Sequence, residues 1–321
     1  MFAVAARARF AALLTVLAGG TGSSAQPLAV AGPNGSTALA EISRGGAARD
    51  ATWKEAHPGL EWTELNLSGR GEARRIRVIA VRLDPARFRL SLENGMAPGG
   101  FLNVWTLDMV PSEAALALNA GMFAGDGAWG WVVHDGIEYR PPRSGPLARA
   151  VVVDSSGAVR LLDDEAVRAI RAVTTDTAVR ADKAVREAFQ SYPALLDHGE
   201  LPAMLTYGVA SAALTASSAP TAIDLTHRDA RLALGLDEKG WLIVALTRFD
   251  VLGSSFGSIP FGLTIPETGL LMRALGAESA VALDGGISAQ LLLRDVGGET
   301  HQWPGLRTVP LGLSAVSVER Q

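Results

Sequence analysis

The sequence contains no cysteine among its 321 residues. This absence excludes disulfides, zinc sites built on cysteine and thiol nucleophiles. An exported eukaryotic protein of this size would usually carry some disulfides. If the chain is exported, we therefore expect a bacterial protein.

The sequence also lacks a concentrated patch of positive charge. Lysine and arginine are dispersed along the chain, and the net charge is −4. Nucleic-acid-binding proteins typically carry a basic stripe interleaved with aromatic residues. We therefore expect no nucleic-acid partner. Acidic and basic residues alternate through 163–187, which is more typical of a solvated helix face than of a binding site.

The N-terminal apolar run is too short to anchor the chain in a bilayer. The run covers Phe10–Ala18, follows Arg7 and Arg9, and precedes the small residues Ser23-Ser-Ala25. This order is typical of a signal peptide, whereas a core helix would not be followed at once by small polar residues. We predict a signal peptide at residues 1–25 and a periplasmic or extracellular protein without a stable membrane anchor.

The sequence shows no internal repeat and no linker after about residue 60. Residues 26–52 are rich in Ala, Gly and Ser, which predicts a flexible tether. The hydrophobic content of 48% then continues in regular patterns. We expect a single domain over residues 53–321.

Strand patterns dominate this domain, and helical patterns interrupt them. We predict helices at Thr106–Glu113, Asp164–Ala172, Ala181–Phe189 and Pro266–Leu275. The predicted strands are Leu60–Leu67, Arg74–Leu83, Phe88–Glu93, Ala114–Asn119, Trp129–His134, Ile137–Tyr139, Val151–Val153, Val159–Leu162, Arg231–Leu236, Trp241–Leu246, Gly276–Leu283 and Gln290–Leu293. The expected fold class is α+β: a single domain with a mixed, mostly antiparallel β-sheet and packed helices.

The most informative stretch is Val281–Gln290, in which a hydrophobic strand leads Asp284 into Gly285 and Gly286. Two residues without a Cβ allow a sharp turn and the close approach of a ligand. An acid at the end of a buried strand is then well placed for chemistry. Taken alone, the same pattern favours a simple Asp-Gly turn.

Three other segments also place polar residues where an apolar run ends. They contribute Asn119 and Gly121, then Gln190 and Ser191, then Arg231 in an Arg-x-Ala-x-Gly pattern. Together, and in this order, these motifs resemble the phosphodiester glycosidase family from about Trp62 to Val318. One departure is Ile287, where many relatives carry a third glycine.

The resemblance implies a hydrolase that cleaves a sugar from a phosphodiester. Its transition state resembles an oxocarbenium ion, so a carboxylate near the anomeric carbon is needed. Phosphate leaves readily, so donors to the departing phosphate matter more than a strong acid. We expect Asp284 to act at C1, Glu267 as acid/base, and Arg231 with His227 on the phosphate. Glu267 could equally just stabilise a helix N-terminus.

Further residues are expected to bind the substrate carbohydrate through amide, hydroxyl or backbone groups. They are Asn119, Gly121, Gln190, Ser191, His227, Gly285, Gly286 and Ser288. Trp129 or Trp131 could add a stacking face, although a core position is commoner for tryptophan.

The metal requirement is left open by the sequence. Asp284, Glu267, Asp250 and Asn119 offer oxygen ligands suited to Ca²⁺ or Mg²⁺, but no spacing specifies a metal loop.

A rival motif is Gly253-Ser-Ser-Phe-Gly257, which fits the Gly-x-Ser-x-Gly pattern of esterases. Ser255 would be the nucleophile, with Asp284 and His301 completing a triad. The required strand and helix do not flank the motif, so we interpret the match as accidental. Two hypotheses remain: an exported hydrolase acting on envelope or extracellular glycans, and a non-catalytic carbohydrate-binding or exopolysaccharide accessory protein.

Overall fold

The computed structural model describes the chain from residue 51 to residue 318 with several gaps. Described are residues 51–68, 76–94, 104–125, 127–174, 185–206, 223–249 and 262–318, with short strands at 29–32, 35–38, 96–97 and 100–101. The predicted signal peptide lies outside these residues. Among the described helices, none combines the length and the apolar character needed to cross a membrane.

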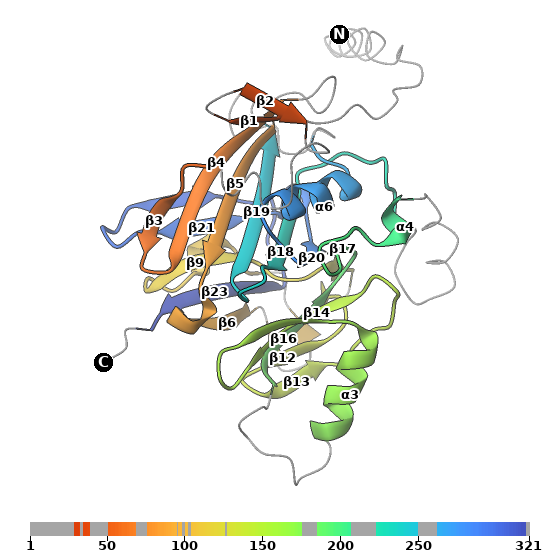
Figure 1. Ribbon diagram of the computed structural model, residues 1–321. Helices are drawn as coiled ribbons and strands as arrows, with labels where there is room; N and C mark the ends of the chain where they lie inside the picture. The colour runs from red at the N-terminus through yellow and green to blue at the C-terminus, as the bar shows by residue number, and fades with distance from the viewer. Residues whose placement is uncertain are drawn as a thin grey trace, which may run out of the picture.

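The largest sheet has nine strands and forms the centre of the molecule (Figure 1). Its strands, in spatial order, are β17 (Ala194–Leu196), β20 (Ser279–Leu283), β18 (Leu232–Leu236), β19 (Leu242–Phe249), β5 (Ile76–Leu83), β4 (Leu60–Ser68), β1 (Ala29–Gly32) and β2 (Gly35–Ala38). The ninth strand, β3 (Lys54–His57), pairs with β4. The hairpin of β1 and β2 lies inside residues 26–52, which the sequence predicts to be a flexible tether. For the other residues of this segment, the tether stays a prediction.

Two five-stranded sheets accompany the large one. The second sheet contains β22 (Thr300–Trp303), β21 (Leu291–Arg294), β9 (Ala114–Asn119), β23 (Leu311–Ser317) and β6 (Phe88–Asn94). The third contains β13 (Ile137–Arg140), β12 (Val132–His134), β16 (Val185–Ser191), β14 (Arg149–Asp154) and β15 (Val159–Leu162). Two short hairpins pair β7 (Met96–Ala97) with β8 (Gly100–Phe101) and β10 (Phe123–Ala124) with β11 (Gly127–Ala128).

The helices are few and lie on the outside of the sheets (Figure 1). They are α3 (Asp164–Thr174), α4 (Ala203–Thr206), α6 (Ile265–Ala274) and the 3₁₀ turns η2 (Pro85–Arg87), η3 (Leu107–Met109) and η6 (Gly286–Ser288). The main core lies where the three sheets face one another, with side chains such as Leu234, Leu118 and Phe189. The other face of the large sheet packs against α6 through Leu271 and Met272.

The α+β prediction is therefore confirmed for a domain of mostly antiparallel strands. It predicted more helix than the described residues contain. Strands dominate, and every pairing between described strands is antiparallel rather than mixed. Thr106–Glu113 is not a helix; only the single turn η3 forms there. Most of the predicted strands and the helices α3 and α6 are confirmed within a few residues.

The prediction of a helix at Ala181–Phe189 is wrong for the part that the structure describes. The segment contains three alanines with one lysine, one arginine and one glutamate, all of which favour helices. The described part instead forms β16, the central strand of the third sheet, with Glu187, Ala188 and Phe189 buried. Pairing on both edges outweighs local helix propensity. This strand delivers Gln190 and Ser191 to the end of the large sheet.

Candidate active site

Asp284 follows β20 directly and is held there by the end of β9. Its backbone N–H donates to the carbonyl of Gly121 at 2.9 Å. The Asn119 side chain donates from Nδ2 to the Asp284 carbonyl at 3.0 Å and accepts from the Gln290 N–H at 3.0 Å. Because Asn119 is fully buried and both ends of its amide are bonded, it fixes the backbone on either side of the glycine loop.

The Asp284 carboxylate forms a compact polar group with Arg307 and Ser288. Arg307 Nη2 donates to Asp284 Oδ2 at 2.8 Å, and Arg307 Nε donates to Ser288 Oγ at 2.6 Å. The Ser288 side chain also acts on the Asp284 carboxylate and favours its charged form, which lowers the pKa of this acid. The Asp284 side chain is 18% exposed and the Arg307 side chain 47% exposed. The acid is therefore enclosed but reachable, and the guanidinium faces solvent beside it.

Burial raises the pKa of Asp284 above its ordinary value, and the negative charge of Asp229 adds to this shift. The bonds to Ser288 and Arg307 act in the opposite direction without cancelling it. The pKa of Tyr192 is also raised, mainly by burial and then by the charge of Asp284. The charge of Asp284 thus acts on Tyr192, whose ring packs on Trp129 at 4.6 Å between centroids.

The glycine pair lets the loop after Asp284 pack against the chain that enters β18. Gly286 has φ +55°, and its N–H donates to the Ala230 carbonyl at 2.8 Å. A Cβ on Gly286 would lie 2.7 Å from Asp229 Oδ2, and one on Gly285 would lie 2.5 Å from the Ala230 carbonyl oxygen. A close approach of protein backbone therefore requires both glycines.

Gln190 and Ser191 lie beside Asp284, but their polar groups are bonded to protein. Gln190 Oε1 accepts from the N–H groups of Trp131 and Arg143, at 3.0 and 2.9 Å, and Nε2 donates to the Arg143 carbonyl at 2.6 Å. Ser191 Oγ donates to the Ala282 carbonyl at 2.5 Å. Both side chains are buried, so they support the walls of the site.

Arg231 lies next to Asp284 by strand register, because β18 pairs with β20 through Leu232 and Leu283. Its guanidinium, however, donates to two backbone carbonyls: Nε to Leu263 at 2.8 Å and Nη2 to His227 at 2.6 Å. Burial lowers the pKa of Arg231, although nearby carboxylates oppose this shift. Arg231 therefore links the segment that contains His227 to the segment that contains Leu263.

Glu267 is bonded to residues other than Asp284. It closes a capping box with Thr264 at the start of α6. Its two oxygens also accept from Arg228 Nη1 and Nη2, each at 2.7 Å. The capping box directly supports the interpretation that Glu267 stabilises the N-terminus of α6. No contact with Asp284 observed in the described part of the chain supports the acid/base role, which stays a prediction.

Three neighbours of Asp284 were not predicted from the sequence: Arg307, Asp229 and Tyr192. Asp229 is only two residues before Arg231, so the Arg-x-Ala-x-Gly motif could have pointed to it. Arg307 follows β22 in an irregular segment with no motif, and its partnership with Asp284 depends entirely on the fold.

The residues suggested as metal ligands are turned toward protein partners. Asp284 binds Arg307, Glu267 binds Arg228, and Asn119 Oδ1 binds a backbone N–H. Asp250 lies outside the described residues. Two other groups of ligand-type side chains occur elsewhere: His134, Asp135 and Glu187, and Asp295, Glu299 and His301. A bound Ca²⁺ or Mg²⁺ therefore stays a prediction.

Two further expectations concern His301 and the tryptophans. Ser255 of the esterase motif lies outside the described residues, while His301 packs against Trp62 at 4.7 Å between ring centroids. Asp284 is bound instead by Arg307 and Ser288. Trp129 and Trp131 are both buried, so neither offers a free face to a sugar.

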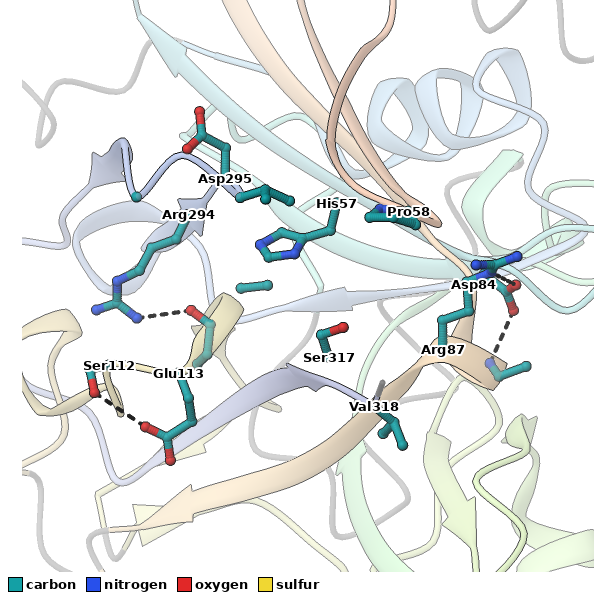
Figure 2. Close-up of a pocket in the computed structure, with 15 residues that line it drawn as sticks. His57, Pro58, Asp84, Arg87, Ser112, Glu113, Arg294, Asp295, Ser317 and Val318 are labelled. Carbon is teal, nitrogen blue, oxygen red and sulfur yellow. Dashed lines mark hydrogen bonds and ion pairs between the residues drawn. The ribbon is translucent and has the colours of Figure 1, made fainter. Parts of the chain in front are cut away.

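A separate cleft of about 950 Å³ lies at the other end of the second sheet (Figure 2). Its walls include Ala114, the first residue of β9, whereas Asn119 at the far end of β9 contacts Asp284. Five residues of strand correspond to roughly 16 Å. This cleft is thus distinct from the polar group around Asp284, and we place the candidate site by its chemistry.

Comparison with known proteins gives a family match and two similar folds. The family model for phosphodiester glycosidase matches residues 112–315. The fold is similar to that of a zebrafish N-acetylglucosamine-1-phosphodiester alpha-N-acetylglucosaminidase catalytic domain, described as auto-inhibited by its pro-peptide, with a TM-score of 0.55, 17% identity, and coverage of 84% of this chain and 87% of that one. It is also similar to a hypothetical protein from Synechocystis, with a TM-score of 0.50, 15% identity, and coverage of 84% and 64%. A search of curated proteins found no match.

Proposed function

Because the chain belongs to the phosphodiester glycosidase family, we propose that it is a hydrolase that cleaves the C1–O bond of a sugar phosphodiester. The observation that carries the proposal is the enclosed, reachable carboxylate of Asp284 bonded to a half-exposed arginine. An acid for the anomeric carbon and a cation for the phosphate then lie within one hydrogen bond of each other. That pairing suits an anionic substrate whose positive charge develops at C1.

In the proposed reaction, Asp284 stabilises the positive charge that develops at C1, or attacks it. The electron pair of the breaking C1–O bond leaves with the phosphate, which becomes a phosphomonoester. Ser288 and Arg307 fix the carboxylate so that little reorganisation is needed. The raised pKa of Asp284 implies that activity requires a pH at which this acid has lost its proton.

Arg307 is the better placed of two candidate arginines for the phosphate. Its side chain is 47% exposed and contacts Asp284, whereas Arg231 donates to two carbonyl oxygens. A guanidinium can bind phosphate through two parallel N–H donors. His227, whose side chain is 50% exposed, is a further candidate donor beyond Asp229.

We further propose that the natural substrate is a phosphodiester-linked glycan of the cell envelope or of extracellular polymer. This part rests on the predicted signal peptide, and on the zebrafish enzyme whose name specifies an N-acetylglucosamine phosphodiester. The alternative is a carbohydrate-binding accessory protein that has kept the fold without turnover.

The test uses a panel of α- and β-linked sugar 1-phosphodiesters, including N-acetylglucosamine. We expect the wild-type protein to release sugar and phosphomonoester, and Asp284→Asn to lose at least about 10³-fold in kcat/KM. Asp237→Asn, in the turn at the opposite end of β18, is the matched control and should keep its activity. Glycan binding without turnover by the wild-type protein would favour the accessory protein instead.

A further inference from the structure

The proposed hydrolysis needs a group that accepts a proton from water, and the predicted one, Glu267, is already occupied. Both its oxygens accept from Arg228, and one also accepts from the N–H of Thr264 at 2.9 Å. A second carboxylate near Asp284 must therefore come from another element.

Asp229 is held at this position by its own backbone. Its N–H donates to the Leu263 carbonyl at 3.3 Å and its carbonyl accepts from the Leu263 N–H at 3.1 Å. One carboxylate oxygen, Oδ1, accepts from the Ala230 N–H at 2.8 Å. The other, Oδ2, makes no hydrogen bond to the residues that the structure describes. Its orientation is therefore fixed while one oxygen stays available.

That second oxygen lies over the loop that follows Asp284. A Cβ added to Gly286 would lie 2.7 Å from Asp229 Oδ2, so the glycine leaves room for this oxygen. The Asp229 side chain is 29% exposed and the Asp284 side chain 18% exposed. The two acids thus share one loop, and both are partly open to solvent. The negative charge of Asp229 also contributes to the raised pKa of Asp284.

We infer that Asp229 is the second carboxylate of the site and takes the proton from the water that attacks the anomeric carbon. This inference rests on the proposed function. The water oxygen forms a bond to C1 as the bond from C1 to the departing group breaks, and the electron pair leaves with that group. The water proton goes to Asp229 Oδ2. His227 Nε2, 3.8 Å from this oxygen and half-exposed, gives the proton a route to solvent.

The charged groups around Asp229 predict one measurable effect of removing its negative charge. Among the described residues, the charged groups that interact with Asp229 include His227, Arg231 and Asp284, and Arg307 binds Asp284. Removing its charge should therefore change how Asp284 titrates. That shift would occur whether or not Asp229 accepts a proton, so a second readout is needed to separate the base from a residue that only holds the loop.

The experiment measures kcat/KM against pH for the wild-type protein, Asp229→Asn and Asp229→Ala on the sugar 1-phosphodiester that the wild type hydrolyses best. We expect each variant to lose about 10²- to 10⁴-fold at the optimum pH. The acid limb of the Asp229→Asn profile should also move to lower pH, because a negative charge near Asp284 has been removed. Asp224→Asn removes an exposed charge near Arg231 and serves as the control.

Azide provides a second readout, because it attacks carbon without losing a proton. We expect added azide to restore turnover of Asp229→Ala and to give a glycosyl azide. Full activity of both Asp229 variants, or a loss of activity that azide does not rescue, would overturn the inference while leaving the hydrolase proposal intact. A wild-type protein that hydrolyses none of the phosphodiesters would overturn the proposed function itself.

Discussion

At the scale of single residues, the Asp284 carboxylate is kept in an unfavourable environment. Burial disfavours its charged form, and Asp229 adds a like charge nearby. Arg307 and Ser288 compensate only in part. A group held in this way destabilises the fold while it serves the reaction, which is a common property of active sites.

Asp284→Asn should therefore stabilise the protein at neutral pH while abolishing turnover. An acid with a raised pKa in the folded state contributes fully to stability below its ordinary pKa, and that contribution is lost as pH rises through the raised value. The variant should be more stable by on the order of 1 kcal/mol at pH 7, and the gain should vanish toward pH 3. Thermal melting across pH tests this; Asp197→Asn, in an exposed ion pair, is the control. A less stable variant at pH 7 would contradict it.

The two arginines near the site should behave differently. Arg307→Gln should lower kcat/KM by about 10²-fold with little loss of stability, because its side chain is half-exposed. Arg231→Gln should mainly lower stability, by about 1–3 kcal/mol, because two carbonyl acceptors lose their donors. Steady-state kinetics and urea unfolding distinguish the two. The reverse pattern would assign the phosphate to Arg231.

At the scale of elements, the site depends on how the loop of η6 packs against the segment that enters β18. Gly286 combines φ +55° with a close contact to Asp229 Oδ2. Gly240, in the turn between β18 and β19, has φ +81° but nothing within 4 Å of a Cβ. The two positions therefore share backbone strain but differ in packing.

Gly286→Ala should consequently cost more stability than Gly240→Ala. Both variants pay about 1 kcal/mol for the left-handed backbone, and only the first must also displace the Asp229 carboxylate. We expect a difference of about 1–2 kcal/mol in urea unfolding, with reduced turnover only for Gly286→Ala. Equal costs would mean that the contact between the loop and Asp229 is loose.

Element predictions from the sequence succeeded where the pattern of burial was local. Strand β9 was predicted to the residue, and α6 follows the proline and apolar face expected of it. Strand β16 was missed because its alanine and charged residues favour a helix in isolation. Its conformation is decided by β12 and β14 on either side, which the local sequence does not contain.

At the scale of the whole molecule, β16 links two sheets through a buried acid. Glu187 is almost fully buried; it accepts from His134 Nδ1 at 3.0 Å and from the Leu92 N–H of β6 at 3.4 Å. Arg186 donates to the Leu90 carbonyl of the same strand at 2.7 Å. The edge of the second sheet is thus held by side chains of the third.

The hydrogen bond that His134 donates to Glu187 raises the pKa of His134, against the opposing effect of burial. A base with a raised folded pKa stabilises the fold fully below its unfolded value, near 6.5, and this stability is lost as pH rises through the raised value. We expect the melting temperature to fall over that window in the wild type and to fall less in His134→Gln. His198→Gln, at a side chain 98% exposed, is the control. Identical pH profiles for the wild type and His134→Gln would contradict this prediction.

The sequence motifs predicted several residues that meet at the Asp284 loop. They did not predict which side chains bind the Asp284 carboxylate. Asn119, Gly121, Ser191 and the Asp284 loop do meet, because their strands end at the same place. Arg307 could not be assigned, because its proximity to Asp284 arises from loop packing between distant segments, whereas Asp229 was missed although it lies two residues before Arg231. For Glu267, a capping position and a catalytic position look alike in sequence; the structure shows the capping box and the pair with Arg228, and the acid/base role stays a prediction.

The most direct test of the central claim is hydrolysis of a sugar 1-phosphodiester in H₂¹⁸O, followed by mass spectrometry of both products. Cleavage of the C1–O bond at Asp284 predicts one ¹⁸O atom in the released sugar and none in the phosphomonoester. Label in the phosphate would show attack at phosphorus and would contradict the assignment of Asp284 to the anomeric carbon.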